Sequence, residues 1–208
     1  MPISTRLSRD FFNRSTLQVA RDLLGARLVR VENGKRISGI IVETEAYRGE
    51  EDQGCHARAG RTARTEVMYG QPGHAYVYFT YGMHWMLNFV AEVRGFPAAV
   101  LIRAVIPTEG LATIEERRGG QPPSHWTDGP AKICQAFGID KELHGADLCA
   151  SDSELFVEKG VSLTDSGVTT GPRVGLNSVP EPWKSIPWRF CADVTAEVLD
   201  TAIQRCDG

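Results

Sequence analysis

The sequence predicts an α+β fold in which helices flank a curved, mainly antiparallel β-sheet, with one β-hairpin protruding from it. Strand patterns cluster early in the chain and helical patterns come later, an order typical of this class. Two dipeptides, Asn33-Gly34 and Tyr81-Gly82, each separate two strand-like segments and predict hairpins. The 208 residues show no repeat and no linker, so we expect a single domain over residues 1–208 that buries a sizeable core.

The first elements are marked by capping and turn residues. The run Ser15-Thr16-Leu17-Gln18 resembles a capping box and opens a predicted helix that ends at Gly25. Residues 26–31 and 36–47 are predicted strands, because Asn33-Gly34 between them is a strong signal for a tight hairpin turn.

A polar loop, a second hairpin and an apolar strand come next. Residues 48–72 are rich in Gly and Arg, and we expect them to form a functional loop that packs back on the site. Residues 76–91 carry aromatic and β-branched side chains on both sides of Tyr81-Gly82, as the two arms of a hairpin would. Residues 98–106 predict a buried strand that a single charge, Arg103, interrupts.

Helices and short strands are expected in the remaining chain. Residues 108–118 are predicted to be helical. A second helix is predicted over residues 130–137, because Pro130 lies in its first turn and Gly138 follows its end. The segment 143–170 is expected to be rich in loops, with short strands.

Composition and charge exclude several classes of protein. The net charge of −3 argues against a generic nucleic-acid binder, although the first hundred residues carry 13 basic against 10 acidic residues. Arg makes up 18 of the 23 basic residues, which suits phosphate contacts but is explained equally well by a GC-rich genome. No apolar run is long enough to cross a membrane. The five scattered cysteines lack a Cys-x-x-Cys pair, which indicates reduced thiols in a cytoplasmic protein and no metal site.

Acidic and aromatic residues alternate at the end of the second predicted strand, in Val42-Glu43-Thr44-Glu45-Ala46-Tyr47. Side chains two residues apart share one face of a strand, so Glu45 and Tyr47 emerge together. A carboxylate near a core is rarely kept unless it is paired or functional. The alternative is that these residues lie on the solvated face of an antiparallel sheet.

The tip of the second hairpin carries large apolar residues where Asn, Asp, Gly or Ser are usual. Tyr81 and Met83 would waste apolar surface in water if the tip were simply exposed. One interpretation is that the tip is buried against another part of the domain. The other is a wedge that enters something flat and stacked, as proteins that open duplex DNA through the minor groove do.

Six motifs occur in an order that resembles the alkyladenine (3-methyladenine) DNA glycosylase family, over about residues 17–190. They are Val-Glu-Thr-Glu-Ala-Tyr at 42–47, the downstream His56, Tyr-Val-Tyr-Phe-Thr-Tyr-Gly-Met at 76–83 with Asn88, Leu-Ile-Arg at 101–103, Gly-Pro-Ala-Lys at 129–132 and Arg-Val-Gly at 173–175. The resemblance implies a monofunctional repair enzyme that flips a damaged purine out of duplex DNA and hydrolyses its N-glycosidic bond.

The resemblance also implies roles for ten residues. Glu45 corresponds to the general base that activates water, Arg103 helps to hold that water, and the backbone carbonyl of Val174 is a third contact. Tyr47, His56 and Tyr78 would enclose the flipped base, and His56 would hydrogen-bond its exocyclic atom. The remaining four are Asn88, set against the guanine amino group, Tyr81 as the intercalating residue with Met83 beside it, and Lys132 as a phosphate contact.

The same resemblance implies damaged double-stranded DNA as the partner, no cofactor and no metal, no obligatory protein partner, and a monomer. Structural interpretations stay open for single residues: Arg103 could be a buried ion-pair partner of Glu43 or Glu45, His56 could satisfy a loop backbone, and Asn88 could be an exposed strand residue. Ala131, His84 and Thr65 depart from residues frequent in the family. The rival functions are a non-catalytic damage binder and a hydrolase of free nucleosides.

Overall fold

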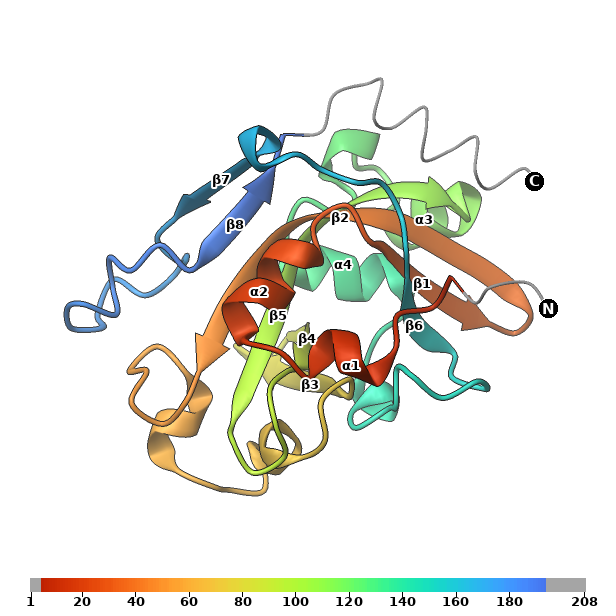
Figure 1. Ribbon diagram of the computed structural model, residues 1–208. Helices are drawn as coiled ribbons and strands as arrows, with labels where there is room; N and C mark the ends of the chain where they lie inside the picture. The colour runs from red at the N-terminus through yellow and green to blue at the C-terminus, as the bar shows by residue number, and fades with distance from the viewer. Residues whose placement is uncertain (1–4, 194–208) are drawn as a thin grey trace.

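The computed structural model describes residues 5–193, which form an α+β fold around one eight-stranded sheet (Figure 1). The strand order is β3-β4-β5-β2-β1-β6, with β8 beside β2 and β7 beside β8, and every strand pair in the described chain is antiparallel. The predicted fold class is confirmed. The strands are β1 Arg27–Glu32, β2 Lys35–Arg48, β3 Ala75–Thr80, β4 His84–Val90, β5 Ala98–Glu109, β6 Leu155–Glu158, β7 Val168–Gly171 and β8 Arg189–Ala192.

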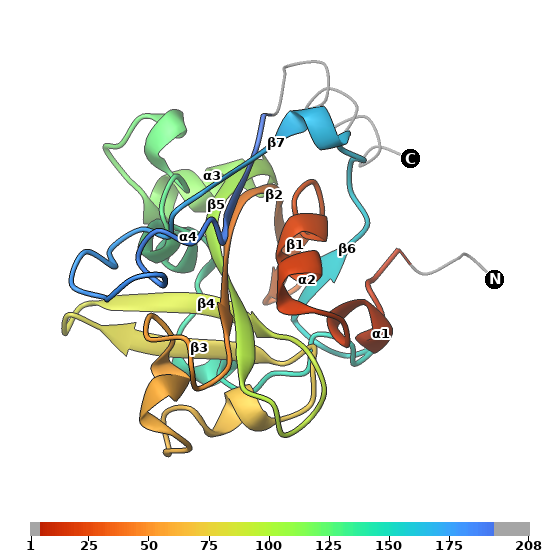
Figure 2. The same cartoon turned by 60° about the vertical axis from the view of Figure 1, so that its left-hand side comes forward.

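Helices flank the sheet on two sides. Figure 2 shows α1 and α2 on one side of the β2–β5 pair, and α3 and α4 on the other. Residues from α2, α4 and the central strands belong to one hydrophobic core. No helix in the described range 5–193 is long and apolar enough to cross a membrane. The helices are α1 Arg9–Phe12, α2 Thr16–Asp22, α3 Leu111–Arg117 and α4 Pro130–Phe137, with 3-10 turns at His56–Ala59, Glu66–Tyr69, Pro123–His125, Lys141–Leu143 and Asp165–Gly167.

Helix α2 forms where the capping signal predicts it, but the cap comes from elsewhere. The side chain of Ser15 makes no capping hydrogen bond. Instead, the carboxylate of Glu92 accepts hydrogen bonds from the Thr16 backbone N–H at 3.1 Å and from its hydroxyl at 2.6 Å. Glu92 also pairs with Arg48 at 2.7 Å, so one acid ties the helix start to the end of β2. The predicted capping box is therefore wrong, since a residue distant in the sequence satisfies the same donors.

Strand β2 carries the acid-rich motif and changes partner along its length. The Asn33-Gly34 hairpin is confirmed, with φ of 51° and 73° at the two turn residues. Up to Ile40 the strand pairs with β1; over Glu43–Glu45 it pairs with β8, and β5 runs along its other edge. The register with β5 shifts between Ile41 and Glu43, a bulge of the kind that redirects side chains beside functional sites.

The second hairpin, β3–β4, is confirmed and extends to one side of the sheet in Figure 2. Its turn residues Tyr81 and Gly82 have φ of 53° and 70°, and the Met83 N–H donates to the Thr80 carbonyl at 3.2 Å. The side chains of Tyr81 and Met83 are 86% and 68% exposed. The interpretation that this tip is buried is therefore wrong.

Strand β5 is longer than predicted, and the helix after it starts later. Pairing of Pro107 and Glu109 with β2 continues the strand to Glu109, and the Ser38 hydroxyl donates to the Glu109 carboxylate at 2.9 Å. Gly110, with φ of 73°, then separates the strand from α3, which begins at Leu111 and not at residue 108. Helix α4 is confirmed over residues 130–137, and short strands β6 and β7 lie in the loop-rich region as expected.

Candidate active site

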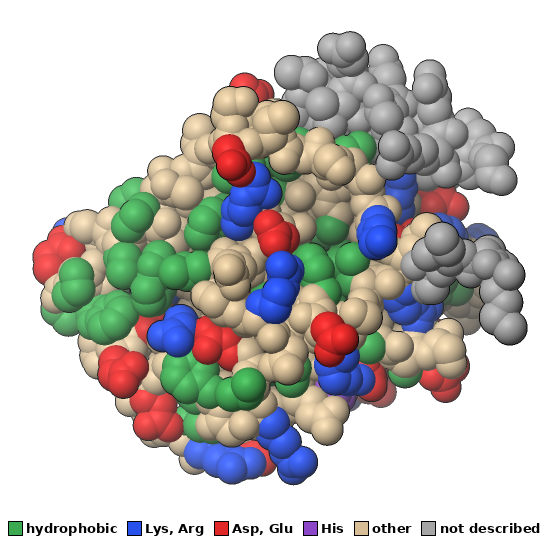
Figure 3. All heavy atoms as spheres, in the orientation of Figure 1, with side chains coloured by type: hydrophobic (Ala, Val, Ile, Leu, Met, Phe, Trp, Pro, Cys, Tyr) green, Lys and Arg blue, Asp and Glu red, His purple; other side chains and the backbone are tan. Residues whose placement is uncertain are grey.

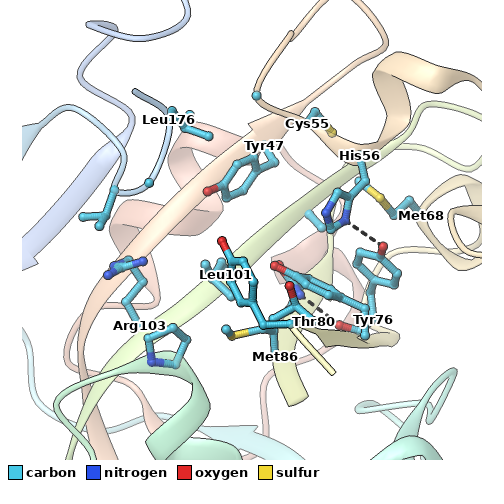
Figure 4. Close-up of a pocket in the computed structure, with 18 residues that line it drawn as sticks. Tyr47, Cys55, His56, Met68, Tyr76, Thr80, Met86, Leu101, Arg103 and Leu176 are labelled. Carbon is cyan, nitrogen blue, oxygen red and sulfur yellow. Dashed lines mark hydrogen bonds between the residues drawn. The ribbon is translucent and has the colours of Figure 1, made fainter. Parts of the chain in front are cut away.

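A cavity of about 240 Å³ opens where the end of β2, the β3–β4 hairpin, β5, the loop 48–72 and the loop after β7 meet (Figure 4). Seven of the ten predicted site residues line it: Tyr47, His56, Tyr78, Tyr81, Asn88, Arg103 and Val174. Glu45 lies behind Tyr47 and Val174 and bonds to both. Met83 and Lys132 do not line the cavity. The fold thus brings together side chains from five segments of the chain around one cavity.

Glu45 is completely buried and has three partners. The Tyr47 hydroxyl donates to Oε2 at 2.8 Å, and the Val174 backbone N–H donates to Oε1 at 2.6 Å. The Arg103 guanidinium lies 3.4 Å from Oε1. A buried carboxylate is stable only when its lone pairs are bound in this way. The interpretation that Glu45 lies on a solvated sheet face is therefore wrong.

Burial also sets the acidity of this carboxyl group. Loss of solvation raises the pKa of Glu45 above its usual value, while Arg103, the Val174 N–H and the Tyr47 hydroxyl act in the opposite direction. The partners therefore offset burial in part. A carboxylate with a raised pKa is a stronger base than a solvated one, which suits proton abstraction from water.

Arg103 joins two carboxylates at the edge of the cavity. Its Nε lies 3.1 Å from Glu43 Oε1 and 3.4 Å from Glu45 Oε1. Glu43 is also paired with Arg189 at 3.2 Å. The ion pair of Arg103 with Glu43 or Glu45, which the sequence offers as the structural role of Arg103, is thus present. Arg103 also lines the cavity, so the pairing leaves it positioned to face a bound molecule.

Aromatic rings form the wall between the loop and the hairpin. The His56 ring meets Tyr78 edge-on with ring centroids 4.5 Å apart, and Tyr76 lies 5.4 Å from Tyr78. His56 Nδ1 is 2.9 Å from the Tyr76 hydroxyl (Figure 4), so its ring contacts a side chain and not the loop backbone. Sequence reasoning did not place Tyr76 at the site, although its position two residues before Tyr78 indicates the same strand face.

His56 is held neutral by its surroundings. Burial, followed by the charges of Arg64 and Arg58, lowers the pKa of His56 to about 4. Arg64 Nη2 lies 3.4 Å from His56 Nε2. Since a guanidinium only donates, Nε2 acts as the acceptor, and Nδ1 carries the proton toward Tyr76.

Asn88 is buried on β4, so the interpretation of an exposed strand residue is wrong. Its amide nitrogen donates to the Tyr76 carbonyl at 3.0 Å across the hairpin. This bond fixes the orientation of the Asn88 amide, which lines the wall of the cavity.

Lys132 lies in the first turn of α4 and is paired. Its Nζ is 2.7 Å from Asp128 Oδ1, and Asp128 also contacts His125 at 2.8 Å. The charge of Lys132 is therefore partly compensated in the unbound protein.

Figure 3 shows one face of the molecule, on which acidic and basic side chains are interspersed. Hydrophobic side chains gather on this face where the loop between β7 and β8 lies.

A buried ion pair next to the cavity was not predicted. Asp52 and Arg173 are both fully buried and joined by two hydrogen bonds, that from Nη2 to Oδ1 measuring 2.7 Å. The Arg173 guanidinium lies over the Tyr47 ring, 4.6 Å from its centroid. The available signals were that Arg173 belongs to the Arg-Val-Gly motif and that Asp52 lies between two recognised motifs, and neither indicates pairing.

Comparison with known proteins agrees with this arrangement. A family model described as methylpurine-DNA glycosylase (MPG) matches residues 10–196. A protein named "Putative 3-methyladenine DNA glycosylase" from Methanocella arvoryzae is 50% identical over 191 residues, covering 91% of this chain and 92% of that protein. Proteins of the same name from Carboxydothermus hydrogenoformans and Desulfitobacterium hafniense are each 45% identical, covering 88% and 89% of this chain and 93% and 94% of theirs.

Proposed function

Since the chain belongs to the methylpurine-DNA glycosylase family, we propose that it removes alkylated or deaminated purines from duplex DNA by hydrolysis of the N-glycosidic bond. The substrates we propose are 3-methyladenine, 7-methylguanine, ethenoadenine and hypoxanthine. The reaction is monofunctional and leaves an abasic site without strand cleavage. The observation that carries this proposal is the fully buried, three-partnered Glu45 beside an aromatic cavity.

Glu45 acts as the general base. As the bond from C1′ to the purine nitrogen breaks, the sugar gains oxocarbenium character, which a nearby carboxylate stabilises. Water then bonds to C1′ and gives a proton to Glu45, while the electron pair of the broken bond leaves with the purine. Arg103 and the carbonyl of Val174 hold the water. An alkylated purine that is already cationic leaves without further protonation.

The aromatic cavity receives the extruded base. Removing a base from the stack costs a few kcal/mol, and less when the base is damaged or mispaired. Stacking against Tyr47 and Tyr78 returns roughly 1–3 kcal/mol per base. His56 contacts the exocyclic edge of the base, and Asn88 opposes the amino group of guanine, so undamaged guanine fits poorly.

The hairpin tip takes the place of the extruded base. Tyr81 enters the duplex from the minor groove, with Met83 beside it, as apolar wedges do in other minor-groove proteins. Their exposure of 86% and 68% makes both side chains available without unfolding. Lys132 contacts a phosphate after exchanging its partner Asp128 for DNA.

The test is single-turnover release of hypoxanthine, ethenoadenine and methylated purines from duplex oligonucleotides. Wild type should release a base and leave a product that is cleaved only after alkali. Glu45→Gln should bind the lesion and release no base above background. Glu43→Gln is the matched control, because it also removes a carboxylate contacting Arg103 but one that is bonded to Arg189 and not to Tyr47 or Val174, and it should lose much less activity. Appreciable turnover by Glu45→Gln would refute the general-base role, and no release by wild type from any substrate would refute the function.

A further inference from the structure

The buried pair Asp52–Arg173 is joined to the candidate base by a short chain of contacts. Arg173 is followed directly by Val174, whose N–H donates to Glu45 at 2.6 Å. Apart from this bond, no backbone hydrogen bond of the described chain holds Val174, and its side chain is 48% exposed. The residue that positions this N–H is therefore its neighbour, Arg173.

Arg173 is fixed from four directions. Besides its two bonds to Asp52, Nη1 donates to the Ala46 carbonyl at 3.0 Å and Nη2 to the Trp183 carbonyl at 3.3 Å. Its guanidinium lies over the Tyr47 ring, and Tyr47 donates to Glu45. Two of the three partners of the Glu45 carboxylate, the Val174 N–H and the Tyr47 hydroxyl, thus depend on the position of the buried Arg173 guanidinium.

Asp52 connects the same unit to the loop that carries His56. Its carboxylate accepts hydrogen bonds from the N–H groups of Arg48 at 3.2 Å and Gly54 at 2.9 Å. A Cβ on Gly54 would lie 2.7 Å from Leu176 Cδ1 and 2.8 Å from Arg173 Nη2, so the absence of a side chain there permits the close approach of the two loops.

A contribution to the stability of the fold does not by itself explain the buried Asp52–Arg173 pair. Replacing a buried ion pair by apolar residues is often neutral or stabilising, because desolvation of both charges opposes their attraction. A guanidinium clamped by a bidentate carboxylate instead gives directional rigidity. Rigidity is what a hydrogen bond to a catalytic carboxylate requires, since small misplacements reduce rates steeply.

We propose that the Asp52–Arg173 pair is a positioning device for the reaction: it holds the Val174 N–H and the Tyr47 hydroxyl on Glu45 and so fixes the carboxylate toward the cavity. Neither residue touches the substrate. The inference rests on the proposed function, because it assigns the pair a role in base activation by Glu45.

The test compares Asp52→Asn and Gly54→Ala with Asp147→Asn. Asp147 is a matched control, because it also pairs with an arginine, Arg9, and accepts a backbone N–H two residues later, from Cys149 at 2.9 Å. Neither Asp147 nor Arg9 lines the cavity. Single-turnover excision is measured from pH 5 to 9 at a temperature where circular dichroism shows each variant folded, and lesion affinity is measured separately.

Asp52→Asn should lower the single-turnover rate about 10- to 100-fold with lesion affinity changed less than threefold. The rising limb of its pH–rate profile should shift to higher pH, because a carboxylate that loses an N–H donor ionises less readily. Gly54→Ala, which displaces Arg173 without removing a charge, should shift the limb in the same direction, and Asp147→Asn should not. An unshifted limb in Asp52→Asn, with wild type active, would overturn the positioning role; inactive wild type would instead refute the proposed function.

Discussion

Replacing Tyr81 by Asn should stabilise the fold and weaken lesion binding at the same time. Tyr81 has φ of 53°, a left-handed conformation that costs an L-residue roughly 1–2 kcal/mol and that Asn tolerates better. Its side chain is 86% exposed, so little packing is lost on substitution. The protein contains the preferred version of this turn, because Asn33-Gly34 has φ of 51° and 73°. Tyr81→Asn would give the second hairpin the same pair of residues.

The two effects have separate magnitudes. Relief of the left-handed strain should raise the free energy of unfolding by about 1 kcal/mol, which corresponds to a Tm increase of about 2–4 °C for a domain of this size. Loss of the aromatic wedge should remove roughly 1–3 kcal/mol of stacking, which is an affinity loss of roughly 5- to 150-fold.

The assays are calorimetric unfolding and titration of a fluorescent lesion duplex, the latter in a Glu45→Gln background that prevents excision. The reciprocal control is Asn33→Tyr at the other, exposed hairpin turn, which should lower Tm by a similar amount and leave lesion binding unchanged. A lower Tm for Tyr81→Asn would refute the argument that the left-handed conformation of Tyr81 destabilises the turn. Unchanged lesion affinity would show that Tyr81 is not a wedge.

Three other predictions concern charge. The folded-state pKa of His56, about 4, lies below the unfolded value of 6.5, so its neutral burial contributes stability that is complete above pH 6.5 and lost as pH falls toward 4, at most about 3 kcal/mol. His56→Gln should weaken the pH dependence of the free energy of unfolding, measured with urea between pH 4 and 6.5. If the free energy of unfolding changed with pH as steeply as in wild type, the buried neutral imidazole would be contradicted. The raised pKa of Glu45 predicts that the excision rate increases with pH along a limb whose midpoint lies above 4.5. An excision rate that does not change with pH down to pH 4 would exclude a titrating base. Asp128→Asn should release Lys132 and tighten DNA binding by roughly 1.5- to 5-fold at low salt, measured by anisotropy, and the gain should disappear when Lys132→Ala is added.

Elements with local signals could be predicted from the sequence, and elements determined by distant pairing could not. The two hairpins follow from their turn dipeptides, and α4 follows from Pro130 and Gly138. The sequence predicts too early a start for α3, because Glu109 continues β5 by pairing with Ser38, 71 residues away. It also predicts Ser15 as the cap of α2, whereas Glu92 supplies the cap from across the fold. At both helix starts, tertiary contacts override the local sequence preference.

The candidate site divides in the same way. Alternation on a strand correctly puts Glu45 and Tyr47 together, and seven of the ten residues implied by the resemblance line one cavity. Spacing and periodicity do not reveal the pair Asp52–Arg173, because its members are 121 residues apart; Asp52 looks like an ordinary loop charge, and the motif that contains Arg173 does not indicate its partner. The Val174 N–H was missed for a simpler reason, since every residue but proline carries such a donor and the sequence does not say where it points.

The contact between Glu45 and Val174 also has a consequence for synthesis. Its two ends are 129 residues apart, so the ribosome adds the second roughly 6 to 26 s after the first at about 5–20 residues per second. The hairpin that carries Tyr81 is made during that interval. The proposed wedge is therefore synthesised before the backbone N–H that holds Glu45, and under the proposed mechanism excision requires that residues 173–174 have been made.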